Sequence, residues 1–363
     1  MYWIRTSFVI FERRVTLFIM KPPVSSLAGR ASMSVRVHRL ASVPGVAVVV
    51  IDSPKTVNAI TRAMLLALAK AFRELRVDRS VKCVVLTATG RRAFSTGIDL
   101  RDAERVFKMD ESRVDDDIVH QMELCPFPIV GAINGVAINA GFELALACDV
   151  LLASPRASFR DTHAAFGILP SWGLSQKLAR IVGANVARMT SLAASPLAAT
   201  DAHRCGLVNL VVHEADDAHD LSDVDADLHT MMATRGGAAE GGEGGEGGEG
   251  GGRGGVVAGG NAGNGSSAGR GTSRSPGAVP NDLPGDLAPN LVGAALDVAA
   301  RIAAMPRAGV AGYKRVMRDG LAVTYAEGRA EERRRAFEQY RALPESFFQS
   351  MGRKAGLKPR ARL

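Results

Sequence analysis

Alternating and continuous runs of apolar residues predict a β-rich start to the chain. A period of two in VRVHRL and then VAVVVID predicts two strands paired as a hairpin around Ser42–Gly45. Thr61 can cap a helix that ends near Val77, because apolar residues recur there every three or four positions. The short apolar run KCVVLTA that follows predicts a buried strand.

The stretch 128–149, PIVGAINGVAINAGFELALACD, changes from the period of a strand to that of a helix. The run Ile129–Ile133 predicts a strand, and the small residues 139–141 predict a turn into a helix. Free N–H groups and a partial positive charge at a helix N-terminus can stabilise an oxyanion. Glu143 lies in the first helical turn, where a carboxylate could move a proton. The macrodipole favours glutamate there even without catalysis, so this stretch alone leaves both interpretations open.

A similar strand, turn and helix precedes this stretch. In GRRAFSTGIDL, the small residues 95–97 come before a helix expected to begin near Asp99. Two such turns in one domain could each direct one N–H at the same oxygen. Further along, the pattern predicts a strand at CDVLLAS, a loop or short helix carrying Asp161 and His163, helices to about Cys205, and a last strand at GLVNLVV.

Low-complexity sequence interrupts the chain. Residues 214–290 include EGGEGGEGGEGGGRGG and too few apolar side chains for a core, which predicts a disordered insertion. Its Arg-Gly segments could touch RNA, although an inert spacer is the simpler interpretation. Helices are expected again at about 291–304, 307–319 and 324–342. The predicted parts are a leader (1–32), a core domain (33–213), the insertion (214–290), a helical region (291–345) and a basic tail (346–363).

The formal net charge of +8 is concentrated at the two ends of the chain. Residues 1–40 carry seven basic residues and one acid, and residues 351–363 carry five basic residues and no acid. The rest of the chain is weakly acidic, so a DNA-binding function loses its main support, and neither nucleic acid nor a membrane is expected as a partner.

Both ends also resemble targeting signals. The first 32 residues are Arg-rich and poor in acids, which favours a leader for the mitochondrial matrix, with a start at Met33 as the alternative. The final Ala361-Arg362-Leu363 is a variant of the S-K-L address, so a peroxisome-like organelle is the alternative location.

The sequence contains no motif for a metal or a phosphate loop. The four cysteines are scattered without a CxxC pair, HExxH and GxxxxGK[ST] do not occur, and no GxGxxG outside the Gly-rich repeat supports a phosphate loop. Reduced thiols and no metal are therefore predicted. No apolar run reaches the length of a transmembrane helix.

Several segments, occurring together and in order, resemble the enoyl-CoA hydratase/isomerase (crotonase) superfamily. They are VNAI at 57–60, KCVVLTATGRRAFSTGIDL, PFPIVGAINGVAINAGFELALACD, FGILPSWGLSQKLARIVG and AATDAHRCGLVNLVV. RDTHAAFGILPSWGLS further resembles a subset of members with a DTHAxxGxLPxWG block, usually labelled hydratases. The resemblance implies an α/β fold, a crotonase-type spiral of repeated ββα units with a C-terminal helical trimerisation region. A homotrimer or a dimer of trimers is therefore expected.

The resemblance also implies a site for an acyl-CoA thioester, with coenzyme A as part of the substrate and no separate cofactor. The thioester oxygen would accept hydrogen bonds from the backbone N–H groups of Ile98 and Ala140, which stabilises an enolate-like intermediate. The family's turn is commonly a triple glycine, whereas here it is Asn139-Ala140-Gly141. A positive φ at Ala140 would strain that turn.

Hydratases of the family use two glutamates, one to activate water and one to deliver the α-proton. Glu143 matches the first, and the position of the second holds His163, which can act as an acid or base near neutral pH. The alternatives are an ordinary polar role for His163, or Asp161 turned inward in its place.

Contacts with CoA are expected at Asn58, Thr96 and Lys314, with a solvated lysine as the alternative for the last. The predicted function is a hydro-lyase, an enoyl-CoA hydratase of fatty-acid oxidation. The alternatives are a Δ3-Δ2-enoyl-CoA isomerase that uses Glu143 alone, and a crotonase-fold binding protein that has lost catalysis and is associated with RNA.

Overall fold

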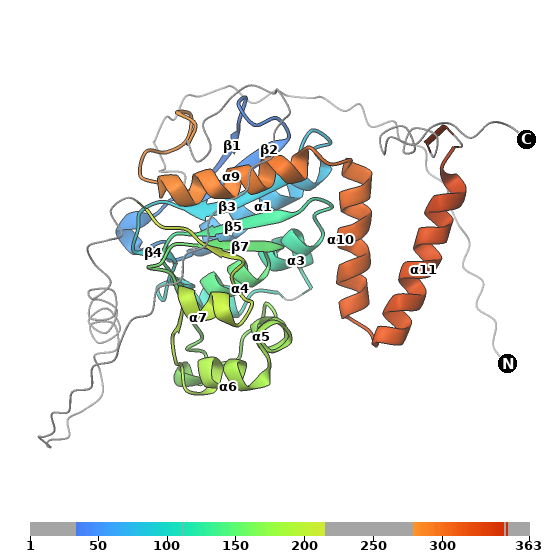
Figure 1. Cartoon of the computed structure of the whole chain (residues 1–363). Helices are drawn as coiled ribbons and strands as arrows, with labels where there is room; N and C mark the ends of the chain where they lie inside the picture. The colour runs from blue at the N-terminus through green and yellow to red at the C-terminus, as the bar shows by residue number, and fades with distance from the viewer. Residues whose placement is uncertain (1–33, 111, 215–278, 345, 348–363) are drawn as a thin grey trace, which may run out of the picture. The chain divides into compact units, whose positions relative to one another are not determined.

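Two β-sheets and the helices around them make up the part of the chain that this computed structural model describes (Figure 1), which is residues 34–110, 112–214, 279–344 and 346–347. The predicted leader (1–32), residues 215–278 of the predicted insertion and residues 348–363 of the predicted basic tail lie outside these residues. The strands are β1 (Val35–Arg39), β2 (Val46–Ile51), β3 (Cys83–Ala88), β4 (Ala93–Ser95), β5 (Ile129–Ile133), β6 (Val136–Ile138), β7 (Val150–Ala153), β8 (Ser158–Arg160), β9 (Leu197–Ala198) and β10 (Leu210–Val211). The α-helices are α1 (Arg62–Val77), α2 (Ala103–Phe107), α3 (Ile118–Glu123), α4 (Ala140–Leu146), α5 (Leu174–Val182), α6 (Ala184–Leu192), α7 (Ala199–Arg204), α9 (Pro289–Ala303), α10 (Arg307–Leu321) and α11 (Tyr325–Ala342).

The larger sheet has the strand order β1-β2-β3-β5-β7-β10 and is covered on both faces. β1 and β2 form the predicted antiparallel hairpin, and the strands from β2 onward run parallel. Val49 of β2 belongs to the apolar cluster that contains Phe72 of α1, whereas its neighbour Val48 belongs to the cluster that contains Leu291 of α9. Strands such as VAVVVI are therefore apolar throughout, because α9 covers one face (Figure 1) and α1 lies against the other.

The smaller sheet, with the order β4-β6-β8-β9, brings the two predicted oxyanion turns together. β4 runs parallel to β6, so the chain leaves both strands at the same edge. The sequence did not predict β6, which has only three residues. A Cβ on Gly135 would lie 2.6 Å from the backbone of Arg92, so a glycine is required for this close approach. β4 leads into residues 96–98 and β6 leads directly into α4.

The helix expected to begin near Asp99 begins later, at Ala103. The carboxylate of Asp99 accepts hydrogen bonds from the backbone N–H of Arg101, at 3.0 Å, and from its guanidinium. This local bonding forms a turn that competes with a helix at the same residues. The prediction of a helix start at Asp99 was therefore wrong by four residues.

The ordered C-terminal region begins earlier than predicted. Leu283 and Leu287 are buried although both fall in the range assigned to the insertion, and α9 begins at Pro289. The buried carboxylate of Glu214 accepts the N–H groups of Asn290, at 3.0 Å, and of Leu291, at 2.9 Å. Glu214, the last described residue before position 279, is thus held against the start of α9.

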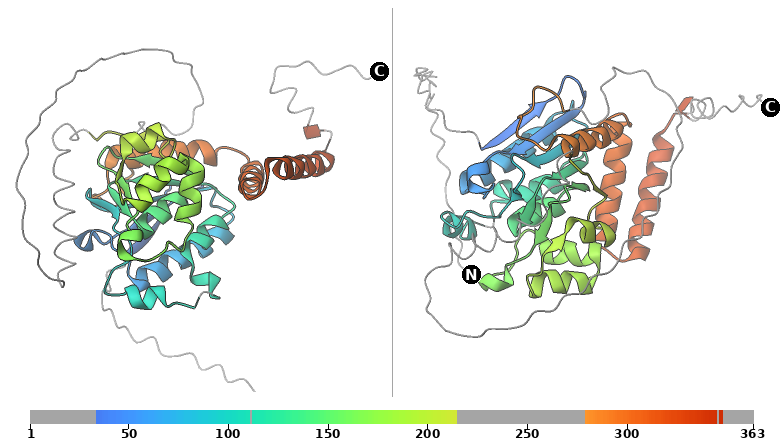
Figure 2. Two further views of the ribbon diagram at one scale, coloured as in Figure 1. Left: turned by 90° about the horizontal axis from the view of Figure 1, so that it is seen from below. Right: turned by 60° about the vertical axis from the view of Figure 1, so that its left-hand side comes forward.

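The remaining two predicted helices are confirmed as α10 and α11. Thr324 and Glu327 form a capping box at the start of α11, which explains why the helix begins there. Arg335 of α11 forms an ion pair with Asp319 of α10, at 2.9 Å, and the two helices lie side by side in all views (Figures 1 and 2).

Candidate active site

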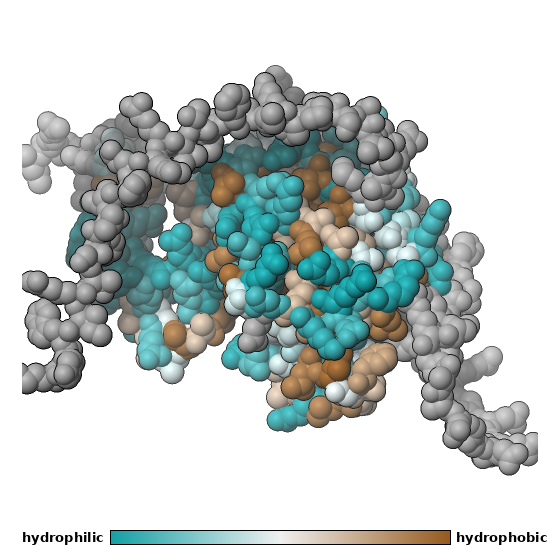
Figure 3. All heavy atoms as spheres, turned by 180° about the vertical axis from the view of Figure 1, so that it is seen from behind, coloured by the Kyte–Doolittle hydropathy of each residue, from teal (hydrophilic) through white to brown (hydrophobic). Residues whose placement is uncertain are grey.

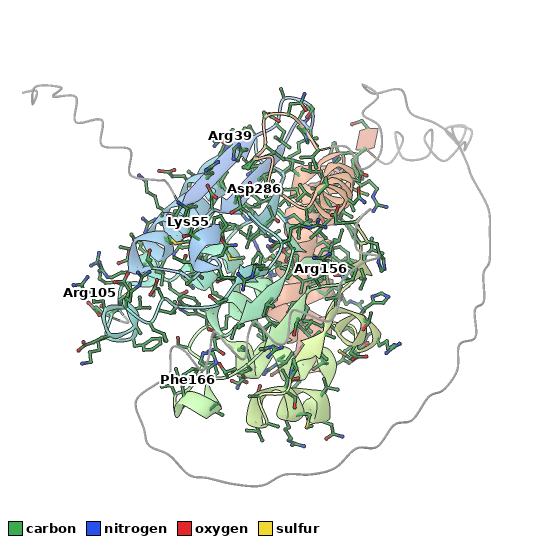
Figure 4. The ribbon with its side chains drawn as sticks, turned by 90° about the vertical axis from the view of Figure 1, so that its left-hand side faces the viewer. Arg39, Lys55, Arg105, Arg156, Phe166 and Asp286 are labelled. Atoms are coloured by element: carbon green, nitrogen blue, oxygen red, sulfur yellow. The ribbon has the colours of Figure 1, made fainter. Side chains whose placement is uncertain are left out.

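One cavity of about 830 Å³ collects most of the predicted site residues. It opens between the start of α4, residues 96–100, the α2 region and the loop 162–172. Its wall is largely apolar and includes Phe166, which Figure 4 shows on the turn that follows His163. Residues predicted from the sequence that line it are Thr96, Ile98, Ala140, Glu143 and His163.

The oxyanion turn is built without strain at Ala140. The positive φ, +47°, falls on Asn139, with a ψ of −111°, while Ala140 is the first residue of α4. This is the conformation of the first central residue of a type II′ turn, where glycine is usual. The strain considered for Ala140 therefore does not arise, and the residue that adopts the unusual conformation is the asparagine.

Two glycines allow the two turns to approach each other. A Cβ on Gly141 would lie 2.4 Å from the carbonyl oxygen of Ser95, so α4 starts directly against β4. A Cβ on Gly97, whose φ is +88°, would lie 3.0 Å from the carbonyl oxygen of Ile138, the residue that ends β6. Among the described residues, no protein acceptor takes the N–H of Ile98 or of Ala140. Both donors are therefore available to a ligand oxygen in the cavity.

Glu143 is held at the floor of the cavity. It is 2% exposed, and its Oε1 accepts the backbone N–H of Trp172 at 2.7 Å. Burial raises the pKa of Glu143, and the Trp172 N–H and the nearby His163 only partly offset this effect. A carboxylate with a raised pKa is suited to exchange protons near neutral pH.

His163 lies in the same cavity and is paired with Asp161. Its Nδ1 is 2.7 Å from Oδ1 of Asp161, and the side chains of both residues are almost completely buried. Although burial alone would raise it, the pKa of Asp161 is lowered, because hydrogen bonds from His163 and Ser191 favour the ionised form. Asp161 does not line the cavity, so the alternative in which it replaces His163 there is not supported.

The loop that carries His163 is tied to the oxyanion turn. Oδ1 of Asn139 accepts both the backbone N–H of Thr162, at 2.7 Å, and its hydroxyl, at 3.1 Å. The sequence pointed to Asn139 only for its backbone and did not predict this contact. The signal available was weak, because an asparagine in a turn of small residues is common.

The three predicted CoA contacts lie in different surroundings. Thr96 lines the cavity. Asn58 is buried away from it and donates to the carbonyl oxygens of Thr89 and Ala93, both at 2.9 Å. Lys314 forms an ion pair with Asp149 at 2.7 Å and is also absent from the cavity wall. Asn58 and Lys314 thus lie outside the wall of this cavity, and their contacts with CoA stay a prediction.

Within the described ranges, no three His, Cys, Asp or Glu side chains are grouped so that they could hold a metal ion. No helix in those ranges is both long and apolar enough to cross a membrane.

The sequence pattern of the enoyl-CoA hydratase/isomerase family matches residues 42–229, which is just over half of the chain. The chain therefore belongs to this family. An enoyl-CoA hydratase structure from Bacillus anthracis matches with a TM-score of 0.58 at 20% identity, over 90% of this chain and 98% of that one. This likeness confirms the predicted crotonase-type α/β fold.

Two proteins with similar sequences are named as enoyl-CoA hydratases. The probable peroxisomal enoyl-CoA hydratase 1 of Arabidopsis thaliana is 56% identical over 172 residues, which are 47% of this chain and 64% of that protein. The short-chain-enoyl-CoA hydratase of Clostridium acetobutylicum is 32% identical over 174 residues, 47% of this chain and 67% of that protein. The match to the first relative thus spans slightly less than two thirds of its length.

Proposed function

We propose that this protein is an enoyl-CoA hydratase that adds water to the double bond of a 2-enoyl-CoA in fatty-acid oxidation. The observation that carries the proposal is one cavity lined by a buried glutamate, a histidine and two backbone N–H groups that no other described residue accepts. These are the groups that the reaction requires: two acid/base side chains and an oxyanion site. The names of both relatives support the same activity.

The chemistry begins at Glu143. As a carboxylate, it takes a proton from water while the water oxygen bonds to C3 of the substrate. The C2=C3 electron pair moves toward the thioester oxygen, where the N–H groups of Ile98 and Ala140 stabilise the charge, by about 3–4 kcal/mol per donor. His163 then delivers a proton to C2. Glu143 passes its proton through solvent to His163, so that one water molecule is added in total.

The test is turnover of crotonyl-CoA by the full chain and by Glu143→Gln. Glutamine keeps the shape and can still accept the Trp172 N–H, so a fall in kcat of about 10³-fold or more is expected from the lost proton transfer. A 3-enoyl-CoA offered in parallel separates hydration from isomerisation. A parent protein that is inert toward enoyl-CoAs of every length, or a fully active variant, would exclude the proposal.

We propose a homotrimer or a dimer of trimers as the active assembly. The exposed apolar side chains on α10 and α11 support a contact with other copies, and Tyr313, Met317 and Leu321 are each more than half exposed. A second group of apolar side chains gathers at the lower end of the face in Figure 3, at the level of α5 and α6 in Figure 1. Light scattering of the purified protein tests this proposal, and a monomer would contradict it.

We also propose a location in an organelle. The Arg-rich start of the chain supports a mitochondrion, while the peroxisomal name of the Arabidopsis relative supports Ala361-Arg362-Leu363 as the address. Fluorescent fusions that lack either residues 1–32 or the last three residues distinguish the two. Only the deletion of the signal in use should release the protein into the cytosol.

A further inference from the structure

The contact between Asp161 and His163 determines which ring nitrogen can face a substrate. Oδ1 of Asp161 lies 2.7 Å from Nδ1 of His163 and 3.1 Å from the backbone nitrogen of the same residue. An ionised carboxylate can only accept hydrogen bonds, so it requires the proton of a neutral ring to be on Nδ1. Nε2 is then the nitrogen left for the cavity, and no described residue hydrogen bonds to it.

Asp161 is itself held in place. It is 3% exposed and accepts two hydrogen bonds from His163, from Nδ1 at 2.7 Å and from the backbone N–H at 3.1 Å. The next residue, Thr162, is fixed by two hydrogen bonds to Asn139. The carboxylate therefore has little freedom to turn away from the ring, so the tautomer of His163 is set before a ligand binds.

We propose that Asp161 is a positioning residue that keeps the His163 proton on Nδ1 and directs Nε2 at C2 of the acyl group. This inference rests on the proposed function, because His163 delivers the proton that C2 receives. In that step the Nε2–H bond of the imidazolium breaks and the C2–H bond forms, while Nδ1–H stays bonded to Asp161. Asp161 also stabilises the imidazolium by its charge and does not touch the substrate.

The kinetic test is a double-mutant cycle on crotonyl-CoA with Asp161→Ala, His163→Gln and the double variant. Asp161→Ala is expected to lower kcat at least about 30-fold with KM changed less than threefold, since general acid–base catalysis contributes 10²–10⁴-fold. In the His163→Gln background the same change should alter kcat less than about twofold, because a residue that acts through His163 has nothing left to position. Equal losses in both backgrounds would overturn the proposal.

The controls separate positioning from folding. Asp161→Asn keeps one acceptor oxygen, while the other becomes an amide donor and the charge is lost. It replaces the alanine variant if that variant does not fold, with a smaller expected loss. Asp52→Ala removes another buried carboxylate, one that pairs with Arg36 and accepts from Thr89 outside the cavity, and should leave kcat unchanged. Thermal unfolding of each variant shows whether it is folded.

A second measurement does not depend on turnover. Magic-angle-spinning ¹⁵N NMR of histidine-labelled protein reports which ring nitrogen carries the proton, at a pH chosen so that the His163 signal shows one protonated nitrogen. The signal that disappears in His163→Gln should be a protonated Nδ1, and Asp161→Ala should shift that proton to Nε2. A wild-type His163 with its proton on Nε2 overturns the inference even if hydration is confirmed. A protonated Nδ1 in an inert protein supports the positioning and contradicts the proposed function alone.

Discussion

The two acid/base groups of the candidate site are held in contrasting ways. Glu143 belongs to α4, whose position depends on the contact of Gly141 with the backbone of β4. His163 belongs to a loop, and the side chains of Asp161 and Asn139 hold that loop by accepting hydrogen bonds from His163 and Thr162. We call Glu143 with α4 the helix half of the site, and His163 with its loop the loop half. The helix half should be sensitive to changes in side-chain volume, and the loop half to changes in side-chain polarity.

Among the substitutions that test this contrast, Gly141→Ala is expected to have the largest effect. The new Cβ would lie 2.4 Å from the carbonyl oxygen of Ser95, so the start of α4 must move away from β4 and displace the N–H of Ala140. A displacement of about 1 Å at a catalytic group costs roughly 100-fold in rate, and overpacking costs about 1–3 kcal/mol of stability. Steady-state kinetics on crotonyl-CoA measure the loss of rate, and thermal unfolding measures the loss of stability.

The matched control for this substitution is Gly309→Ala. Gly309 lies inside α10 with no atom within 4 Å of an added Cβ, so alanine should raise stability slightly and leave kcat unchanged. Full activity in Gly141→Ala would show that the helix half tolerates volume, which contradicts the comparison.

An intermediate effect is expected at Asn139, which links the two halves. Asn139→Gly relieves the positive φ but loses both hydrogen bonds to Thr162, whereas Asn139→Ala loses the bonds and keeps the strain. Because both variants release the loop of His163, both should lower kcat about tenfold, the loss expected for misplacing an acid/base group. Their stabilities should differ by about 1–2 kcal/mol in favour of glycine.

The two Asn139 variants separate the effect of losing the hydrogen bonds that anchor the His163 loop from the effect of backbone strain at Asn139. If kcat followed stability, so that the glycine variant remained fully active, the loop would not need its link to the oxyanion turn. Thr162→Val keeps the hydrogen bond of the backbone N–H to Asn139 and loses that of the hydroxyl. Its kcat should therefore lie between that of the parent and those of the two Asn139 variants.

The sequence predicted the helix half better than the loop half, for a physical reason. The Thr61 cap, the end of α1 at Val77 and the place of Glu143 in a first helical turn all follow from local periodicity, and all three are confirmed. The bond from Thr162 to Asn139 spans 23 residues of chain. No local pattern encodes a contact of that kind.

The same limit explains the other differences between prediction and structure. Lys314 pairs with Asp149, 165 residues away, so a solvated helix face and a structural ion pair look alike in the sequence. β6 has three residues, too few for a period of two to be visible. Asp161 lies two residues before His163, and only the folded loop shows that the two side chains face each other.

The smallest effect concerns stability. Replacing Glu143 and replacing Asp161 should change the free energy of unfolding in opposite directions. The folded-state pKa of Glu143 is raised by burial, so the folded protein binds this proton more tightly than the unfolded chain does. Stability is therefore lost as the pH rises from the unfolded value of the pKa to the folded one. Glu143→Gln should raise the free energy of unfolding by about 1 kcal/mol near neutral pH, with the gain shrinking at acid pH.

Asp161→Asn should act in the opposite direction. Against the effect of burial, hydrogen bonds from His163 and Ser191 lower the pKa of Asp161, so its ionised form contributes stability that is lost as the pH falls through the folded value. The substitution should lower the free energy of unfolding by about 1 kcal/mol near neutral pH, with the difference again shrinking at acid pH. Thermal unfolding of both variants from about pH 4 to pH 8 makes the comparison, since that range covers ordinary carboxyl and histidine titration. Shifts of the same sign would mean that both carboxylates are held alike, and the contrast between the helix half and the loop half would then be limited to catalysis.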